Sequence, residues 1–115
     1  MKKTYLITGG TGFIGSSISN MLLKQGQRVI VFDNNSRGKI SRIFLKDNNL
    51  IFIKGDIRKI NDLRKAFKNK IDVIIHLAYI NGTKYFYTKP EQILDIATKG
   101  LVNIYDLAIK FKVKK

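Results

Sequence analysis

Three glycines at regular spacing form the most informative chemical pattern in the chain: Gly9, Gly12 and Gly15 of "ITGGTGFIG". A glycine-rich turn lets the backbone approach a negatively charged group, because no Cβ atom intervenes. If a helix begins in the turn, its N-terminal N–H groups can hold a pyrophosphate. The spacing is one residue looser than the G-x-G-x-x-G of many dinucleotide-binding proteins. The glycines alone therefore also fit a turn needed only for tight strand–helix packing.

An acidic residue follows the next apolar run, where a dinucleotide site needs one. Asp33 ends "VIVFD" and is followed by asparagine. A carboxylate there can accept hydrogen bonds from both hydroxyls of the adenosine ribose, and its charge opposes a 2′-phosphate. The pattern favours NAD over NADP, although Arg37 keeps NADP open because an arginine can compensate a phosphate. Taken alone, Asp33 also fits an ordinary turn residue.

A tyrosine and a lysine four residues apart have the spacing of an acid–base pair. On a helix, Tyr85 and Lys89 of "KYFYTKP" would share one face, and the ammonium would favour the phenolate. Lys89, however, precedes Pro90, and a residue before proline is biased away from helical dihedrals. We therefore expect this pair not to be catalytic. His76, the only histidine, is expected to be structural, and no cluster of acids and histidine indicates a metal site.

Short apolar runs alternate with helical patterns along the chain, and these elements must position the chemical groups. The apolar runs at 4–8, 28–32, 50–54 and 72–78 predict strands buried on both faces. Helical periodicity predicts a first helix from Phe13 to near Gly26, a second at 60–67 and a third that starts at Pro90. A weaker helical pattern lies at 39–45. This order predicts an α/β fold with a Rossmann-type, doubly wound parallel sheet.

The apolar periodicity also predicts which face each helix buries. For the first helix the predicted face is Phe13, Ile14, Ile18, Met21 and Leu22, and for the second it is Ile60, Leu63 and Phe67. For the helix that starts at Pro90 it is Ile93, Ile96, Ala97, Gly100, Leu101, Ile104, Ala108 and Phe111. The final residues, "FKVKK", are expected to lead into a fifth strand.

The composition limits the class of protein. With 115 residues, 44% of them hydrophobic, the chain can bury a core, and it has no Pro/Gly-rich linker. The absence of cysteine excludes thiolate chemistry and fits the cytoplasm. No apolar run is long enough to span a membrane. The net charge of +14 suggests nucleic-acid binding as one interpretation, but the lysines are scattered along the chain. We therefore expect a solvated basic surface and no nucleic-acid partner.

Polar or small residues also follow the third and fourth apolar runs. Asp56 and Ile57 follow the third run, and His76, Leu77 and Ala78 end the fourth. Ligands of open parallel sheets bind at the carboxyl ends of the strands. Four such strand ends in order therefore indicate a ligand-binding site more specifically than any single strand end does.

The motifs "TGGTGFIG", "DNNSRG", "GDIR" and "HLA", in this order and spacing, resemble the extended short-chain dehydrogenase/reductase family, specifically its NAD-dependent epimerase/dehydratase branch. The resemblance covers essentially the whole chain. It implies an oxidoreductase of nucleotide-sugar metabolism that transfers a hydride to tightly bound NAD and returns it. The sequence departs from the family at "DIATKGLVN", where Ala97 and Leu101 stand in place of an asparagine and a threonine.

The resemblance implies a role for each matching position. Gly9, Gly12 and Gly15 would form the pyrophosphate turn, with backbone contacts from Phe13 and Ile14.

The adenosine ribose would be held by Asp33 and Asn34, with Ser36 and Arg37 close by. Asp56 would reach the adenine amino group and Ile57 would flank the ring. The path to the nicotinamide would be lined by Leu77, Ala78 and Tyr79.

The resemblance also implies where the acid–base residues are. The family uses a serine or threonine after strand five and a Tyr-x-x-x-Lys on the next helix, and both positions would lie beyond Lys115. We therefore expect 1–115 to be the N-terminal part of an NAD(P)-binding Rossmann domain, with strand order 3-2-1-4, truncated before strand five and inactive alone. The catalytic helix and the substrate domain would be absent.

The fourth strand of such a sheet would have an exposed edge. A nucleotide-sugar substrate and a homodimer are expected only of a full-length parent. The alternative is a non-catalytic dinucleotide-binding or sensor module of the same fold.

Overall fold

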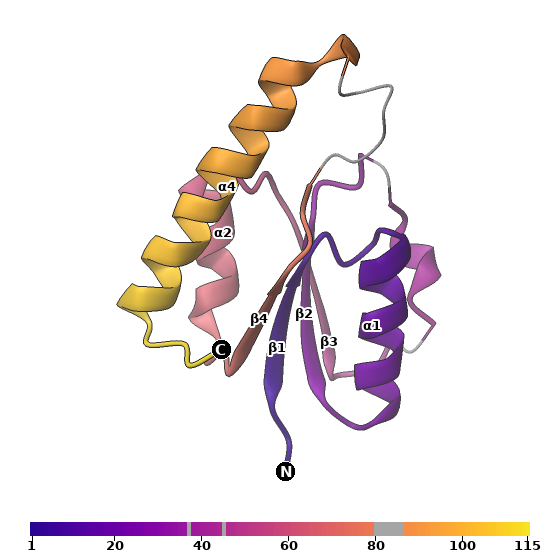
Figure 1. The fold of residues 1–115 in the computed structure, drawn as a ribbon. Coiled ribbons are helices and arrows are strands. Elements are labelled where there is room, and N and C mark those ends of the chain that lie inside the picture. Colours follow the sequence, from indigo (N-terminus) through magenta and orange to yellow (C-terminus); the bar gives the residue numbers. More distant parts are fainter. Residues whose placement is uncertain (37, 45, 80–86) are drawn as a thin grey trace.

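The four strands form one parallel sheet in the order β3-β2-β1-β4, as predicted. The computed structural model describes residues 1–36, 38–44, 46–79 and 87–115. The strands are β1 (Thr4–Thr8), β2 (Arg28–Asp33), β3 (Leu50–Lys54) and β4 (Val73–His76). β1 pairs with β2 and β4, and β2 with β3, all in parallel. The carboxyl ends of all four strands therefore lie at the same edge of the sheet (Figure 1).

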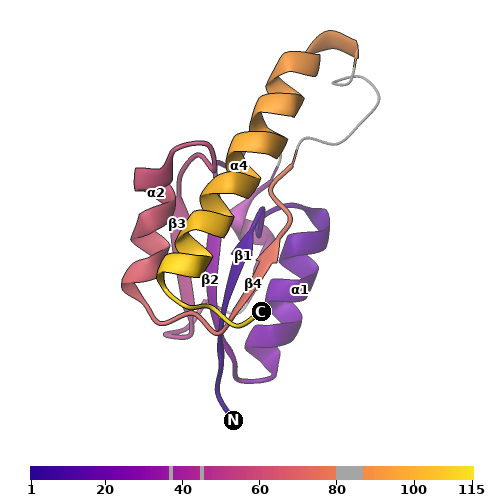
Figure 2. The ribbon, with the colours of Figure 1, turned by 60° about the vertical axis from the view of Figure 1, so that its left-hand side comes forward.

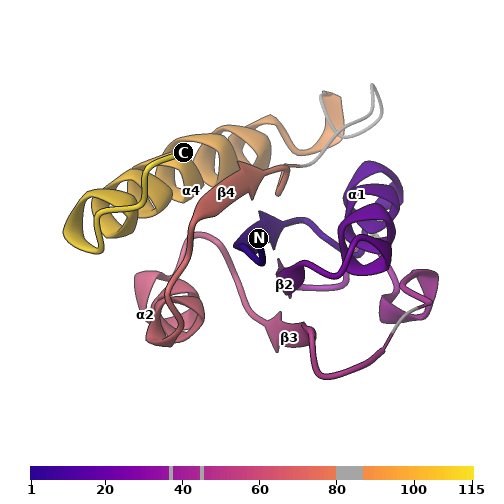
Figure 3. The ribbon, with the colours of Figure 1, turned by 90° about the horizontal axis from the view of Figure 1, so that it is seen from below.

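Helices cover both faces of this sheet and make three layers (Figure 3). One face carries α1 (Phe13–Lys24) and the 3₁₀ turn η1 (Ile40–Arg42). The other carries α2 (Ile60–Arg64), the 3₁₀ turn η2 (Lys65–Lys68) and α4 (Pro90–Lys110). The doubly wound, Rossmann-like architecture predicted from the alternation of apolar runs is confirmed.

Alternating side chains of the central strands fill two separate cores. Leu6, Ile30 and Phe32 pack under α2 and α4, whereas Ile7 and Val31 pack with Val29 under α1. All of these residues are buried. Because both faces are covered, the strands have the near-continuous apolar sequences from which they were predicted.

The predicted apolar face of α1 is partly wrong. Phe13 is 82% exposed and Ile14 60% exposed, and Met21 is also exposed. The helix instead turns its small residues and two leucines inward: Gly15, Ser16, Ser19, Leu22 and Leu23. A Cβ atom on Gly15 would overlap the Gly9 carbonyl oxygen. The start of α1 therefore lies too close to the glycine turn for large side chains, which point away from the sheet.

Within the described part of the weaker helical stretch, residues 39–44, one 3₁₀ turn forms, Ile40–Arg42. Its inward anchor is Ile43, which is fully buried, while Phe44 is 81% exposed. One buried residue does not provide the apolar stripe that stabilises a regular helix. The pattern at 60–67 does form helical structure, first α2 and then η2, and its predicted residues Leu63 and Phe67 are buried.

The long helix α4 begins with Pro90 at its first turn, as predicted. Its buried residues are Ile93, Ile96, Gly100, Ile104 and Leu107. Leu101 and Phe111, which were predicted to be buried, are 47% and 43% exposed, and Leu107 was missed. The inward stripe follows a narrower three- and four-residue alternation than the prediction assumed. The N-terminal half of α4 rises beyond the sheet (Figure 2).

Among the described residues, one backbone hydrogen bond joins the outer edge of β4 to the end of the chain. The Ile74 N–H donates to the Lys115 carbonyl oxygen at 2.8 Å, and Val113 packs against the core. Residues 111–115 form a turn and an irregular segment rather than a strand. The expected approach to a fifth strand is thus limited to this one hydrogen bond.

Candidate functional site

A pocket of about 450 Å³ lies at the carboxyl ends of the strands. Every predicted cofactor-binding residue that the structure describes lines it: Gly9, Gly12, Phe13, Ile14, Gly15, Asp33, Asn34, Ser36, Asp56, Ile57, Leu77, Ala78 and Tyr79. Arg37, the remaining predicted position, lies outside the described residues. The fold thus gathers segments from four strand ends around one cavity, and its volume lies within the range usual for small-molecule sites.

The glycine turn between β1 and α1 has a geometry that excludes larger residues. Gly9 has φ +72°, and a Cβ atom there would lie 2.9 Å from backbone atoms of Leu77 and Ala78. Its N–H donates to the Phe32 carbonyl oxygen at 2.8 Å. Gly12 precedes α1 without a side-chain cap, and the first turn of the helix contains no acidic residue. The helix N-terminus therefore faces the pocket with a partial positive charge that no side chain of its own first turn neutralises.

Asp33 is held at the end of β2 by two backbone groups. Its Oδ2 accepts from the Thr11 N–H at 3.1 Å and its Oδ1 from the Asn35 N–H at 2.8 Å. Asn35 has φ +61°, a left-handed conformation that asparagine tolerates. Each carboxylate oxygen keeps a further lone pair for a hydroxyl group. Next to it, Asn34 accepts from the Ser36 N–H at 2.9 Å.

Arg42 is a pocket residue that sequence reasoning missed. It comes from η1, and its Nη1 donates to the Thr11 carbonyl oxygen at 3.3 Å. Arg37 was the only cation predicted at this end. The path of the loop after β2, rather than any motif, brings Arg42 to the site. Phe32, Gly55 and Ile96 also line the pocket without having been predicted.

Asp56, at the end of β3, is held mainly by a charged side chain. Its Oδ1 accepts from the Arg58 backbone N–H at 2.9 Å and from Nε at 3.1 Å. Its Oδ2 accepts from Nη2 of the same arginine at 2.8 Å. These Arg58 hydrogen bonds are the main cause that lowers the pKa of Asp56 from its ordinary value, against a smaller effect of burial.

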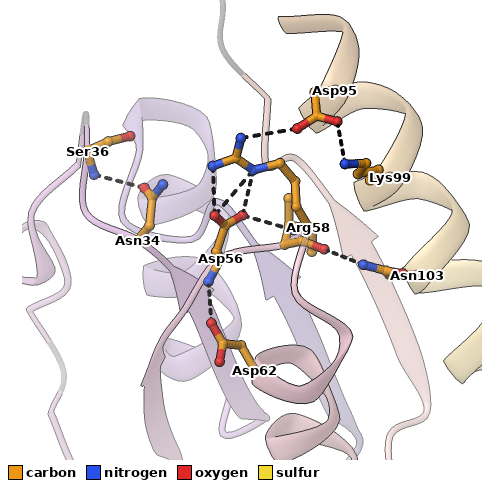
Figure 4. A network of polar contacts seen from close by, with 9 residues as sticks. Asn34, Ser36, Asp56, Arg58, Asp62, Asp95, Lys99 and Asn103 are labelled. Atoms are coloured by element: carbon orange, nitrogen blue, oxygen red, sulfur yellow. Dashed lines mark hydrogen bonds and ion pairs between the residues drawn. The ribbon is translucent and has the colours of Figure 1, made fainter. Parts of the chain in front are cut away.

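Arg58 joins this carboxylate to α4 (Figure 4). Its Nη1 lies 3.2 Å from Asp95 Oδ2, and Lys99 Nζ lies 3.0 Å from Asp95 Oδ1. The Lys99 hydrogen bond, followed by that of Arg58, lowers the pKa of Asp95. Asn103, two turns further along, donates to the Ile57 carbonyl oxygen at 3.0 Å.

The ends of β1 and β4 meet at a buried threonine. Thr8 Oγ1 accepts from the Leu77 and Ala78 N–H groups, at 3.0 and 3.2 Å. His76 Nδ1 lies 2.7 Å from the same oxygen. Since the hydroxyl already accepts two hydrogen bonds, it donates its own proton to Nδ1, which assigns the neutral Nε2–H tautomer to His76. Burial lowers the pKa of His76 and favours this neutral form. The histidine thus has a structural hydrogen bond.

The remaining candidate groups form no second site among the residues that the structure describes. Tyr85 lies outside the described residues, and Lys89 has φ −139° and ψ 53°, which is not helical. Within the described ranges, no group of three or more histidine and acidic side chains could hold a metal ion. In the same part of the chain, no helix is both long and apolar enough to cross a membrane.

Comparisons with known proteins agree with this architecture. A parallel sheet in this order, with a glycine turn after its first strand, is the Rossmann-like class of α/β fold. Residues 5–115 match the family described as "NAD dependent epimerase/dehydratase family". The chain belongs to this family, which confirms the resemblance seen in its motifs.

Two curated relatives show the range of the match. The chain is 36% identical to a UDP-glucose 4-epimerase of Cyamopsis tetragonoloba, in an alignment that covers 98% of the chain and 34% of the relative. It is 37% identical to a UDP-N-acetyl-alpha-D-glucosaminuronate decarboxylase of Bacillus cytotoxicus, over 99% of the chain and 35% of the relative. The chain thus spans about a third of the length of these relatives.

Solved structures also match nearly the whole of this chain and about a third of their own length. An epimerase from Methanothermobacter thermautotrophicus superposes with a TM-score of 0.91 at 32% identity, over 97% of this chain and 33% of that one. A UDP-glucose 4-epimerase of Thermus thermophilus in complex with NAD gives a TM-score of 0.87 at 28% identity, over 96% and 35%.

Proposed function

We propose that the chain binds NAD in the pocket at the carboxyl ends of its strands, as the N-terminal part of a nucleotide-sugar epimerase or dehydratase. The main support is one observation: the uncapped glycine turn and the Asp33 carboxylate face the same cavity. The helix N-terminus favours a pyrophosphate and the carboxylate favours a ribose diol. These groups match the two ends of an adenosine diphosphate.

The remaining predicted residues extend this arrangement in two directions. Asp56 and Ile57 form the adenine end, where a carboxylate oxygen accepts from the amino group and the isoleucine contacts the ring. Leu77, Ala78 and Tyr79 form the path to the nicotinamide. Arg42 adds a cation beside the ribose end, but the charge of Asp33 opposes a 2′-phosphate, so NAD is preferred over NADP.

The chain's own part in a reaction is binding and orientation. Bound NAD would supply hydride chemistry, by accepting a hydride from a sugar hydroxyl and returning it. The glycine turn would fix the pyrophosphate, and the neutral His76–Thr8 pair would hold the backbone of Leu77 and Ala78 in place. None of the described pocket residues is proposed as the acid or base. We infer that catalysis needs residues outside this chain and that the chain alone is inactive.

The wider assignments rest on the family. UDP-sugar enzymes among the relatives support a nucleotide sugar as the substrate of a full-length parent. A homodimer is proposed only for that parent. We also propose a cytoplasmic location, and neither a metal nor a nucleic-acid partner is part of the proposal. The rival is a non-catalytic dinucleotide sensor of the same fold, which would bind NAD without needing a sugar.

The test is to measure the affinities of the chain for NAD and NADP by calorimetry, before and after Asp33→Ala. Loss of the diol contacts should weaken NAD binding roughly tenfold or more, whereas NADP binding should fall less because a repulsive charge is also removed. Asp106→Ala, which removes an exposed aspartate on α4, is the control and should change neither affinity. Absence of NAD binding in the unaltered chain, or equal losses for both cofactors, would contradict the assignment.

Catalytic inactivity is tested separately, by adding UDP-glucose and NAD to the chain. Turnover of the sugar would show that the acid–base residues lie inside the 115 residues.

A further inference from the structure

We propose that Arg58 is a positioning residue for adenine recognition, which orients the Asp56 carboxylate in the pocket and is itself held by α4 through Asp95. This inference rests on the proposed function, in which Asp56 accepts a hydrogen bond from the adenine amino group. Arg58 does not line the pocket, so its role would be indirect.

Arg58 supplies several of the hydrogen-bond donors around the Asp56 carboxylate. A carboxylate offers about four lone-pair positions. The Oδ1 atom uses two, for the Arg58 backbone N–H and Nε. The Oδ2 atom accepts from Nη2 at 2.8 Å and shares Nε at 3.2 Å. One arginine therefore fixes the plane of the carboxylate, and the remaining acceptor capacity lies mainly on Oδ2.

Arg58 itself cannot turn freely. Its Nη1 lies 3.2 Å from Asp95 Oδ2, while Nε and Nη2 contact Asp56. Lys99 in turn holds the other oxygen of Asp95 at 3.0 Å. Figure 4 shows this row of alternating charges running from the end of β3 to α4. Because a planar guanidinium forks between two carboxylates, its rotation would break one pair or the other.

The backbone of the turn has supports of its own. The Asp56 N–H donates to Asp62 Oδ2 at 3.0 Å, and the Lys59 N–H to the Asp56 carbonyl oxygen at 2.9 Å. Asn103 holds the Ile57 carbonyl oxygen. Loss of the Arg58 side chain should therefore release the Asp56 carboxylate while the turn and the fold persist.

The experiment compares the affinity for NAD with that for nicotinamide hypoxanthine dinucleotide, in which a carbonyl oxygen replaces the adenine amino group. The ratio of the two dissociation constants is the readout, because a purely structural change would weaken both ligands alike. We expect the unaltered chain to prefer NAD. Arg58→Gln should lower that preference roughly tenfold, the value of one charge-assisted hydrogen bond. Asp95→Asn should lower it by a smaller factor.

Two controls make the readout specific. Arg64→Gln, on α2, removes an arginine whose side chain hydrogen-bonds to Asn61 and not to Asp56 or Asp95 in the described part of the chain, and should leave the preference unchanged. In an Asp56→Asn background the preference should already be low, and adding Arg58→Gln should change it no further.

Each outcome has one meaning. A chain that binds neither ligand contradicts the proposed function and this inference with it. Binding both equally leaves dinucleotide binding intact but overturns the adenine contact and the positioning role. An unchanged preference in Arg58→Gln, with the circular dichroism spectrum of the unaltered chain, overturns the positioning role alone. If Arg58→Gln does not fold, an unchanged preference in Asp95→Asn overturns it.

Discussion

Asp33 ends β2 and Asp56 follows the end of the neighbouring strand β3; both line the same pocket, yet they are held in different ways. Asp33 is bound by two neutral backbone N–H groups, of Thr11 and Asn35. Asp56 is bound by the guanidinium of Arg58, which also contacts Asp95 on α4. The first carboxylate depends on the conformation of the glycine turn. The second depends on a chain of charges that crosses to another element.

Because the two carboxylates have different hydrogen-bond donors, their positions should be sensitive to different changes. Hydrogen bonds from backbone groups depend on the backbone conformation and little on ionic conditions. Ion pairs between partly exposed side chains are weakened by salt and by protonation. The Asp33 end should therefore respond to changes in backbone conformation, and the Asp56 end to solvent conditions.

The largest effect is expected from Gly9→Ala, which acts on the turn at the Asp33 end. Alanine would meet backbone atoms of Leu77 and Ala78 and would be strained at φ +72°. We expect a loss of about 3 kcal/mol in the free energy of unfolding, measured with urea. Gly26→Ala is the matched control, since Gly26 has φ +80° but open space around it. It should cost only about 1 kcal/mol, and equal losses would exclude the close backbone approach as the cause.

A smaller effect is expected from acid at the Asp56 end. The pKa values of Asp56 and Asp95 lie below 3.8, their ordinary value. Their stabilising contribution is therefore present above about pH 4 and is lost as the pH falls through the lowered values. Arg58→Gln removes the main cause of the Asp56 shift. We expect its stability, relative to the unaltered chain, to be lower near neutrality and to converge toward it in acid. A constant difference in urea unfolding between pH 6 and pH 2 would contradict this.

The smallest effect is expected from salt, which should change the stability difference between the unaltered chain and Arg58→Gln. The Arg58 and Asp56 side chains are 30% and 21% exposed, so the net contribution of the pair should be about 0.5 kcal/mol. At 1 M NaCl the screening length falls to about 3 Å, and the stability difference between the unaltered chain and Arg58→Gln should narrow. Arg64→Gln provides the baseline for general salt effects. A difference that grows with salt would argue against an ion pair.

The sequence predicts the sheet and most of the pocket because these features depend on local patterns. Apolar runs define strands buried on both faces, and the order of those strands then places Gly9, Asp33 and Asp56 at one edge. The position of Asp33 in the pocket was predicted from its place at the carboxyl end of an apolar run, and Asp33 is the last residue of β2. Only the boundaries differ, as where β4 ends at His76.

The features that were missed depend on contacts between distant segments. The exposure of Phe13 and Ile14 follows from the close approach of Gly15 to Gly9, which apolar periodicity does not encode. Arg42 reaches the pocket by the path of an irregular loop. The pairing of Arg58 with Asp95 joins residues 37 positions apart, and no spacing rule predicts it. Periodicity thus describes elements well, but not how closely they approach.

The glycine before α1 also links folding to ligand binding. A serine, threonine or aspartate in place of Gly12 would cap the helix and contribute about 1 kcal/mol to stability, but its side chain would use the N–H groups that the proposed pyrophosphate needs. Gly12 has no side chain that could cap the helix, so α1 lacks this stabilising contribution. A ligand that binds only the folded chain would instead stabilise the fold by mass action. At a ligand concentration of a hundred times the dissociation constant, this stabilisation is about 2.7 kcal/mol. If the chain binds NAD as proposed, its melting temperature should therefore rise with the concentration of NAD.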